Sequence, residues 1–194
     1  SLGSLSLLKG LDFSGNQLTG AIPMSLGSLR ELQTFSLSRN SFYGGLQVFQ
    51  NMTRLEVFDI GANQFTGQIP SSIFECPELQ TFSASVNCLS TELPTSICQA
   101  SNLENLLISG LQQSGNGNCA TTSFAYVTLP SCIWSLKSLQ QLYISGNSYS
   151  GKIGSTPLNN LRTFSAKNNR LRGVVPTFFN NQTMKLFLVL FMTQ

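Results

Sequence analysis

Short stretches in which apolar and polar residues alternate recur at regular intervals along the chain. Each stretch begins with a leucine, continues as an apolar–polar–apolar triplet, and reaches an asparagine three residues after that triplet. The clearest copy contains, in order, Leu55, Phe58, Ile60, Asn63, Phe65, Gly67, Ile69 and Pro70. Alternation with a period of two directs every second side chain to the same face, so each triplet predicts a short β-strand with one buried face.

The asparagines of these stretches give the repeat length. They are Asn16, Asn40, Asn63, Asn87, Asn147 and Asn169, and the first four are separated by 24, 23 and 24 residues. One such unit cannot bury its apolar face alone, whereas stacked units share a continuous core. The pattern therefore predicts an α/β-type solenoid of about seven repeats of 22–24 residues, with strands paired about 4.8 Å apart in one parallel sheet, one strand per repeat.

The polar and turn-forming positions of the unit have separate expected roles. The amide of each asparagine can bond backbone groups of the neighbouring turn, so the six asparagines predict a ladder through the stack. The glycine that comes next suits a tight bend, and the Ile-Pro step favours extended backbone on the return side.

Thr91 replaces the glycine in the fourth repeat, and three other repeats depart further from the template. Gln47 and Gly154 stand where the second and sixth repeats should have proline, and Leu111 stands where the fifth should have asparagine. Pro130 comes 19 residues after Leu111, whereas the clearest copy needs only 7 from its asparagine to its proline. We therefore predict an insertion of about twelve residues, forming a polar, glycine-rich loop at about 112–128 that leaves the solenoid wall.

The Leu-x-Gly-x-Ile-Pro half of the unit resembles the plant-type subclass of leucine-rich repeat. That subclass occurs in plant receptor kinases, receptor-like proteins and polygalacturonase inhibitors, and in secreted proteins of some algae and other protists. The resemblance covers residues 2–183. It implies an extracellular right-handed superhelix with a parallel sheet on its concave face, and it identifies neither the receptor nor the ligand.

The two ends of the chain differ from its interior. We predict the repeat array over residues 1–183, and we interpret the chain as a fragment because it starts in mid-array at Ser1, without an initiating methionine, signal peptide or cysteine-containing cap. Residues 184–194 are predicted to form a final strand or a truncated tail. Their apolar run of about nine residues is short of the about 20 that cross a membrane, so the start of a cut-off membrane segment is an alternative, as is an unrelated tail.

Composition narrows the function. Charged residues make up 10% of the chain and the net charge is +3, which excludes a nucleic-acid interface built on basic patches. Histidine is absent, so no histidine-based triad, base or metal site exists. Nucleotide-binding and zinc-protease motifs are also absent. We therefore expect a protein that is not an enzyme and has no cofactor, with any kinase domain or membrane segment outside this chain.

The five cysteines allow several pairings. Cys76, Cys98 and Cys132 fall near the same point of consecutive repeats, so Cys98 is within reach of either neighbour. Cys119, in the predicted loop, could pair with Cys132 or Cys88. The odd number leaves at least one thiol unpaired, and buried cysteines without any bridge remain an alternative.

Two sequons, at Asn51 and Asn181, lie just before a new repeat begins, on the expected convex or lateral surface. Because a glycan there would leave the sheet uncovered, both are candidate glycosylation sites.

The outward positions of the strands form the expected binding surface, since a solenoid usually binds through its concave sheet. Most of them are small and neutral. The exceptions, and our candidate ligand-binding residues, are Asp12, Arg39, Asp59, Tyr143 and Lys167. Tyr143 is the best anchor because tyrosine combines a rigid contact area with a polar tip. It lies in the repeat directly after the insertion, so we predict one site made of Tyr143 and residues 112–120.

These observations favour an extracellular recognition module, part of a cell-surface receptor ectodomain in signalling or defence. The expected partner is a protein, peptide or glycan, with a co-receptor as a further partner. A secreted inhibitor of a cell-wall-degrading enzyme is one alternative. A structural or ice-binding surface protein is another, prompted by the Ser/Thr-rich face.

Overall fold

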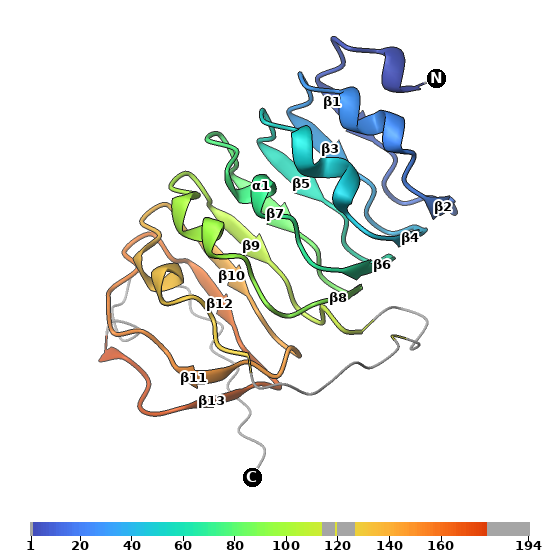
Figure 1. The fold of residues 1–194 in the computed structure, drawn as a ribbon. Coiled ribbons are helices and arrows are strands. Elements are labelled where there is room, and N and C mark those ends of the chain that lie inside the picture. The colour runs from blue at the N-terminus through green and yellow to red at the C-terminus, as the bar shows by residue number, and fades with distance from the viewer. Residues whose placement is uncertain (1, 114–118, 120–126, 178–194) are drawn as a thin grey trace.

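The computed structural model describes residues 2–113, 119 and 127–177. They form a curved stack of seven rungs, each of which begins with one strand of the main sheet (Figure 1). The main-sheet strands are β1 (Gly10–Asp12), β3 (Thr34–Ser36), β5 (Val57–Asp59), β7 (Thr81–Ser83), β9 (Asn105–Leu107), β10 (Gln141–Tyr143) and β12 (Thr163–Ser165). All neighbouring strands pair in parallel, which confirms the predicted solenoid.

The strand register lines up one inward column of apolar side chains. Its members are Leu11, Phe35, Phe58, Phe82, Leu106, Leu142 and Phe164. Within this column the Phe35 and Phe58 rings stack with centroids 5.6 Å apart, and Phe58 and Phe82 repeat that separation. The aromatic residues of the triplets therefore form a continuous core through the stack.

A second set of strands was not predicted, since the sequence pattern led us to expect one strand per repeat. The chain turns after each asparagine and forms a further short strand in most rungs. These strands are β2 (Thr19–Ala21), β4 (Ser41–Gly44), β6 (Gln64–Gly67), β8 (Cys88–Leu89), β11 (Ser150–Lys152) and β13 (Arg170–Arg172). They pair in the orders β2-β4-β6-β8 and β11-β13, so this lateral sheet is interrupted at the fifth rung.

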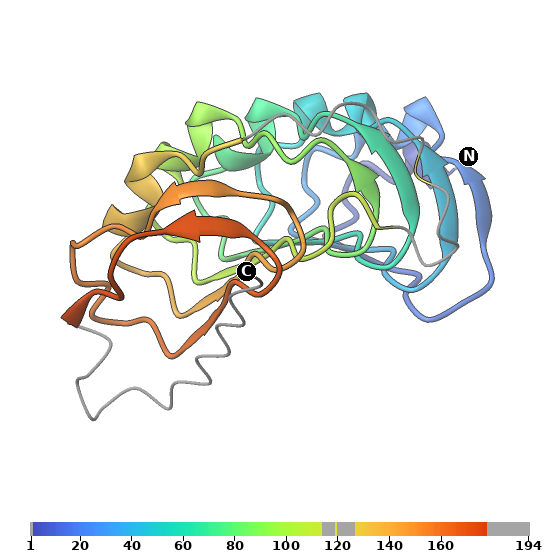
Figure 2. The same ribbon diagram turned by 90° about the horizontal axis from the view of Figure 1, so that it is seen from below.

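Short helices cover the outer edge of the arc, side by side (Figure 2). They are η1 (Leu2–Ser4), η2 (Met24–Ser28), η3 (Gln47–Asn51), α1 (Ser71–Phe74), η4 (Thr95–Gln99) and η5 (Ser131–Ser135). Four of the last five begin directly after a proline whose backbone is extended, with φ between −52° and −65°. The Ile-Pro or Leu-Pro step thus brings the chain from the lateral sheet to the helical edge.

The asparagines join consecutive rungs. Asn63 Oδ1 accepts a hydrogen bond from the Phe42 N–H at 3.0 Å, and its Nδ2 donates to the carbonyls of Leu37 (2.9 Å) and Ile60 (3.1 Å). Four other asparagines repeat this pattern with both rungs: Asn40, Asn87, Asn147 and Asn169. Asn16, in the first rung, donates only to carbonyls of its own rung.

The fifth rung lacks the ladder asparagine, and a backbone carbonyl takes over one of its hydrogen bonds. The Leu89 N–H, which would bond an asparagine oxygen, donates instead to the Leu111 carbonyl at 2.6 Å. Tyr149 of the sixth rung is fully buried, and its hydroxyl donates to the Thr91 carbonyl of the fourth rung at 2.7 Å. Burial raises the pKa of this phenol well above its usual value. A side chain from rung six therefore spans the interruption of the lateral sheet.

Candidate ligand-binding face

A shallow groove of about 460 Å³ runs across the concave sheet where the strands end. It is lined by residues of the first five rungs, among them Ser14, Arg39, Asp59, Ser85 and Leu107. Five rungs at the strand spacing span about 19 Å, which is the length of about six residues of extended peptide. The groove therefore has the dimensions of a site for an extended chain.

In each rung, one backbone N–H just after the main-sheet strand makes no bond to a carbonyl of the neighbouring rung, because the ladder asparagines already bond the carbonyls beside it. Side chains supply the acceptor in most rungs. Asp12 and Asp59 each accept the N–H two residues ahead, at 2.8 and 3.0 Å. In the fifth, sixth and seventh rungs a serine of the preceding rung accepts it, at 2.9–3.1 Å.

Two of these N–H groups, those of Ser38 and Ser85, have no acceptor within the described part of the chain. Both residues line the groove, on either side of the third rung. Such donors bond to water or to a ligand. The groove thus offers two main-chain donors, about two strand spacings or about 9.6 Å apart, to an acceptor-bearing ligand.

The five predicted ligand-binding residues do not form one cluster. Arg39 and Asp59 both line the groove, whereas Asp12 lies beside its first-rung end. Hydrogen bonds from the Ser14 side chain and backbone hold the pKa of the Asp12 carboxyl below its usual value. Asp12 and Asp59 therefore each stabilise a turn by accepting a backbone N–H. The sequence pattern alone did not reveal this structural role.

Arg39 differs from these two acids because its side chain is exposed and its backbone has a positive φ of 57°. It stands at the turn after β3, at the rim of the groove. Among the described residues the one ion pair joins Arg54 to Glu31 on a different surface, so the Arg39 guanidinium is available to a carboxylate or carbonyl.

Tyr143 and Lys167 lie beyond the groove, toward the later rungs. Tyr143 is half-buried and pairs in register with Leu107, which lines the end of the groove. The Lys167 N–H is held by Ser145 Oγ at 2.9 Å, and that hydroxyl also lies 2.9 Å from Ser165 Oγ. Tyr143 therefore continues the groove, whereas Lys167 stands one rung further on.

The insertion is described only at its two ends and at Cys119. Gln113 folds back over the turn of rung six, where its amide would contact a β-carbon placed on Gly146 at 3.2 Å. Gly146 is three residues after Tyr143, so the start of the insertion lies near that tyrosine. Residues 114–118 and 120–126, which complete the predicted loop, lie outside the described residues.

Two disulfides tie the fourth rung to the insertion and to the next helix along the edge. Cys98 of η4 is bonded to Cys132 of η5, and Cys88 of β8 is bonded to Cys119 of the insertion. The suggested pairing of Cys76 with Cys98 is wrong, because Cys98 is bonded to Cys132 of the next rung. Cys76 is instead a buried free thiol that donates to the Met52 carbonyl at 3.0 Å, and burial raises its pKa.

Of the two sequons, the one at Asn51 lies within the described residues. Asn51 ends η3 with an exposed side chain, on the helical edge away from the groove, while the next residue, Met52, is buried. Asn181 lies outside the described residues, as does the segment 184–194. Among the residues that the structure does describe, no helix is long and apolar enough to cross a bilayer, and no three acidic or cysteine side chains gather as metal ligands do.

Comparison with known proteins agrees with this geometry. The Leucine Rich Repeat family matches residues 7–29 and 54–76. Receptor-like protein 35 of Arabidopsis thaliana is 36% identical over 164 residues, which are 84% of this chain and 16% of that protein.

Two solved structures show the same fold over almost the whole chain. The crystal structure of a TDR receptor has a TM-score of 0.82 and 32% identity, covering 95% of this chain and 31% of its own. The plant peptide hormone receptor RGFR1, in complex with RGF2, has a TM-score of 0.79 and 25% identity, covering 93% of this chain and 27% of its own. This chain therefore spans less than a third of the length of these relatives. The receptor relatives and the two disulfides together indicate an extracellular chain of the secretory pathway.

Proposed function

Since this chain is built of leucine-rich repeats and is similar to a plant receptor-like protein, we propose that it is a ligand-recognition segment of a cell-surface receptor ectodomain. Its ligand is an extended peptide or a peptide segment of a protein, bound across the concave sheet. Its role is recognition rather than catalysis, and any kinase domain or membrane segment belongs to other parts of the protein. A co-receptor is a further partner of the assembled complex.

The observation that carries this proposal is the concave groove, with its two open main-chain donors and one exposed guanidinium. The Ser38 and Ser85 N–H groups would bond carbonyl oxygens of the ligand, and Arg39 would bond a carboxylate or a further carbonyl. Tyr143 would supply apolar contact beyond the groove, together with the insertion that starts beside it. The relative RGFR1, solved in complex with RGF2, is a peptide hormone receptor, which supports a peptide as the ligand class.

Selection from a displayed library of random twelve-residue peptides tests this proposal. Selected peptides would be titrated by calorimetry against the parent chain, Arg39→Gln, Tyr143→Ala and Gln113→Ala. We expect each change to weaken binding at least fivefold, and the Tyr143→Ala loss to persist at high salt, because salt does not screen the apolar contact of the ring.

Arg30→Gln is the matched control, because Arg30 is exposed just after η2 on the helical edge. Its affinity should stay within twofold of the parent. If peptide affinity responded to Arg30→Gln as strongly as to Arg39→Gln, the site would lie elsewhere. The same would hold if affinity responded to none of Arg39→Gln, Tyr143→Ala and Gln113→Ala.

A further inference from the structure

Charge is distributed very unevenly along this solenoid. Residues 1–104 contain all eight acidic side chains and four basic ones, whereas residues 105–194 contain seven basic side chains and no acidic one. The modest net charge of the chain hides this separation. The later rungs thus present positive charge that no carboxylate of their own sequence neutralises.

Part of that charge is gathered on the strand pair β11–β13. Lys152 and Arg172 are direct cross-strand partners, and both side chains are exposed. The Lys152 stem lies against the chain at Gly173, where an added β-carbon would be 3.6 Å from Lys152 Cγ. Like charges directly opposite each other in a sheet destabilise it, so the fold tolerates an unfavourable pair at this point.

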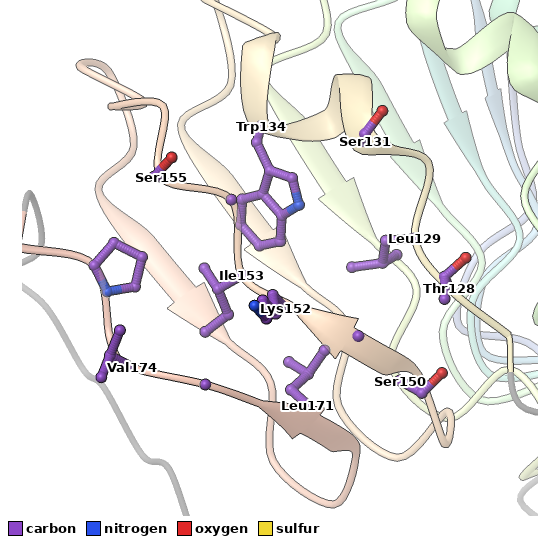
Figure 3. A pocket seen from close by; sticks show the side chains of 14 residues that line it. Thr128, Leu129, Ser131, Trp134, Ser150, Lys152, Ile153, Ser155, Leu171 and Val174 are labelled. Carbon is purple, nitrogen blue, oxygen red and sulfur yellow. The ribbon is translucent and has the colours of Figure 1, made fainter.

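An apolar hollow of about 550 Å³ lies beside the pair (Figure 3). Trp134, Ile153 and Leu171 surround it, and Lys152 is among its lining residues. It is separate from the concave groove, with which it shares no lining residue. Of the two cations only Lys152 lines the hollow, and Arg172 stands opposite it on the neighbouring strand, so the apolar walls and the cation pair adjoin and suit a ligand carrying both an apolar anchor and negative charge.

We propose that β11, β13 and the adjoining hollow form a second binding surface, whose partner is an acidic peptide segment with one bulky apolar residue. In an extended segment, neighbouring side chains point to opposite faces and those on one face recur about every 6.6 Å, so the two acids that flank the anchor lie together on one face, toward Lys152 and Arg172, while the anchor points to the other. The apolar residue enters the hollow between Trp134 and Leu171. This surface is independent of the concave site and of what that site binds.

The test is fluorescence anisotropy with a labelled nine-residue peptide that has Asp at alternate positions and one central Leu. The full chain should bind it, and replacing every Asp by Asn should weaken binding at least tenfold. Replacing the Leu by Ser should weaken binding about fivefold, which corresponds to the loss of one buried leucine contact at about 1 kcal/mol.

Two double variants separate this surface from general charge attraction. Lys152→Gln with Arg172→Gln should weaken binding at least tenfold without lowering Tm, since it removes a like-charge pair. Lys137→Gln with Arg162→Gln removes the same charge at exposed positions outside the strand pair, and should stay within twofold. Arg39→Gln should leave this binding unchanged, so failure here is distinguishable from failure of the concave site.

Three outcomes would overturn the proposal. The first is equal weakening by the two double variants, which would show attraction to overall charge alone. The second is indifference to the central Leu, which would remove the hollow. The third is tighter binding of a polyuronate chain than of the peptide, with the same dependence on Lys152 and Arg172, which would assign the surface to an acidic polysaccharide.

Discussion

At the scale of single residues, the buried asparagine amides hold the rungs together. Asn63 is 2% exposed, and its amide satisfies one N–H and two carbonyls of two rungs at once. At Leu111 the chain has no such amide, and the Leu111 carbonyl accepts the Leu89 N–H in its place. The asparagine position therefore fixes backbone geometry as well as stability.

Replacing Asn63 by Leu should lower the free energy of unfolding by about 1–3 kcal/mol, because it leaves buried backbone groups without partners. Denaturant unfolding followed by circular dichroism measures this. Asn16→Leu is the control, since Asn16 is exposed and bonds only within its own rung. A loss as large in the control as in Asn63→Leu would contradict the role given to the ladder.

Gly154 stands in place of proline because Trp134 covers that position. A β-carbon there would overlap the indole at Trp134 Cγ. Gly154→Ala should therefore destabilise the chain by about 1–3 kcal/mol through overpacking. The emission of Trp134, the only tryptophan of the chain, should shift as the ring moves.

Gly10→Ala is the matched control for Gly154→Ala, because nothing lies within 4 Å of a β-carbon at Gly10. It should leave both the unfolding midpoint and the tryptophan emission unchanged. An unchanged emission spectrum in Gly154→Ala would show that contact with Trp134 is not the reason for glycine at this position.

At the scale of elements, the weakest connection in the stack lies between rungs four and six. The lateral sheet stops at β8 and resumes at β11, and the ladder lacks its asparagine at Leu111. Both disulfides lie at this interruption, and Tyr149 crosses it. Covalent bonds and one buried side chain thus reinforce a stretch in which backbone pairing is reduced to isolated bridges.

Replacing Cys98 and Cys132 together by Ser should cost about 3–4 kcal/mol, since their bridge closes a loop with a sequence separation of 34. Thermal unfolding with and without reductant measures the cost, and the double variant should keep only the part of the sensitivity to reductant that comes from Cys88–Cys119. Thiol titration of the unfolded, unreduced parent should find one thiol per chain, that of Cys76. Three or more thiols would contradict the two bridges.

At the scale of the whole molecule, the candidate sites lie on different surfaces. The helical edge carries Asn51, the concave sheet carries the groove, and the lateral sheet of the last rungs carries the cationic pair. A bulky group on one surface therefore leaves the others accessible.

Expression in a secretory host should give a chain that carries an N-glycan at Asn51, and Asn51→Gln should lower the mass by one glycan. Mass spectrometry before and after enzymatic deglycosylation measures this. Affinity for peptides selected on the concave groove should be the same for both forms, because Asn51 lies on the helical edge. A glycan-dependent affinity would contradict this division of surfaces.

The repeat, the inward column and the identity of the ladder residues could all be predicted from the amino-acid sequence, because each depends on the spacing of residues within one unit. Phe58, Ile60 and Asn63 have their roles whatever the neighbouring rungs contain. The insertion is predicted for the same reason, as a departure from a fixed spacing between Leu111 and Pro130.

Features that depend on contacts between particular rungs were found only in the tertiary structure. The lateral sheet arises from pairing between rungs, which no single unit encodes. The partners of Cys98, the contact of Trp134 with Gly154 and the reach of Tyr149 to Thr91 all result from the shape of the interrupted fifth rung. Lys152 and Arg172 are 20 residues apart in the chain, and only the stacking of two rungs brings their charges face to face.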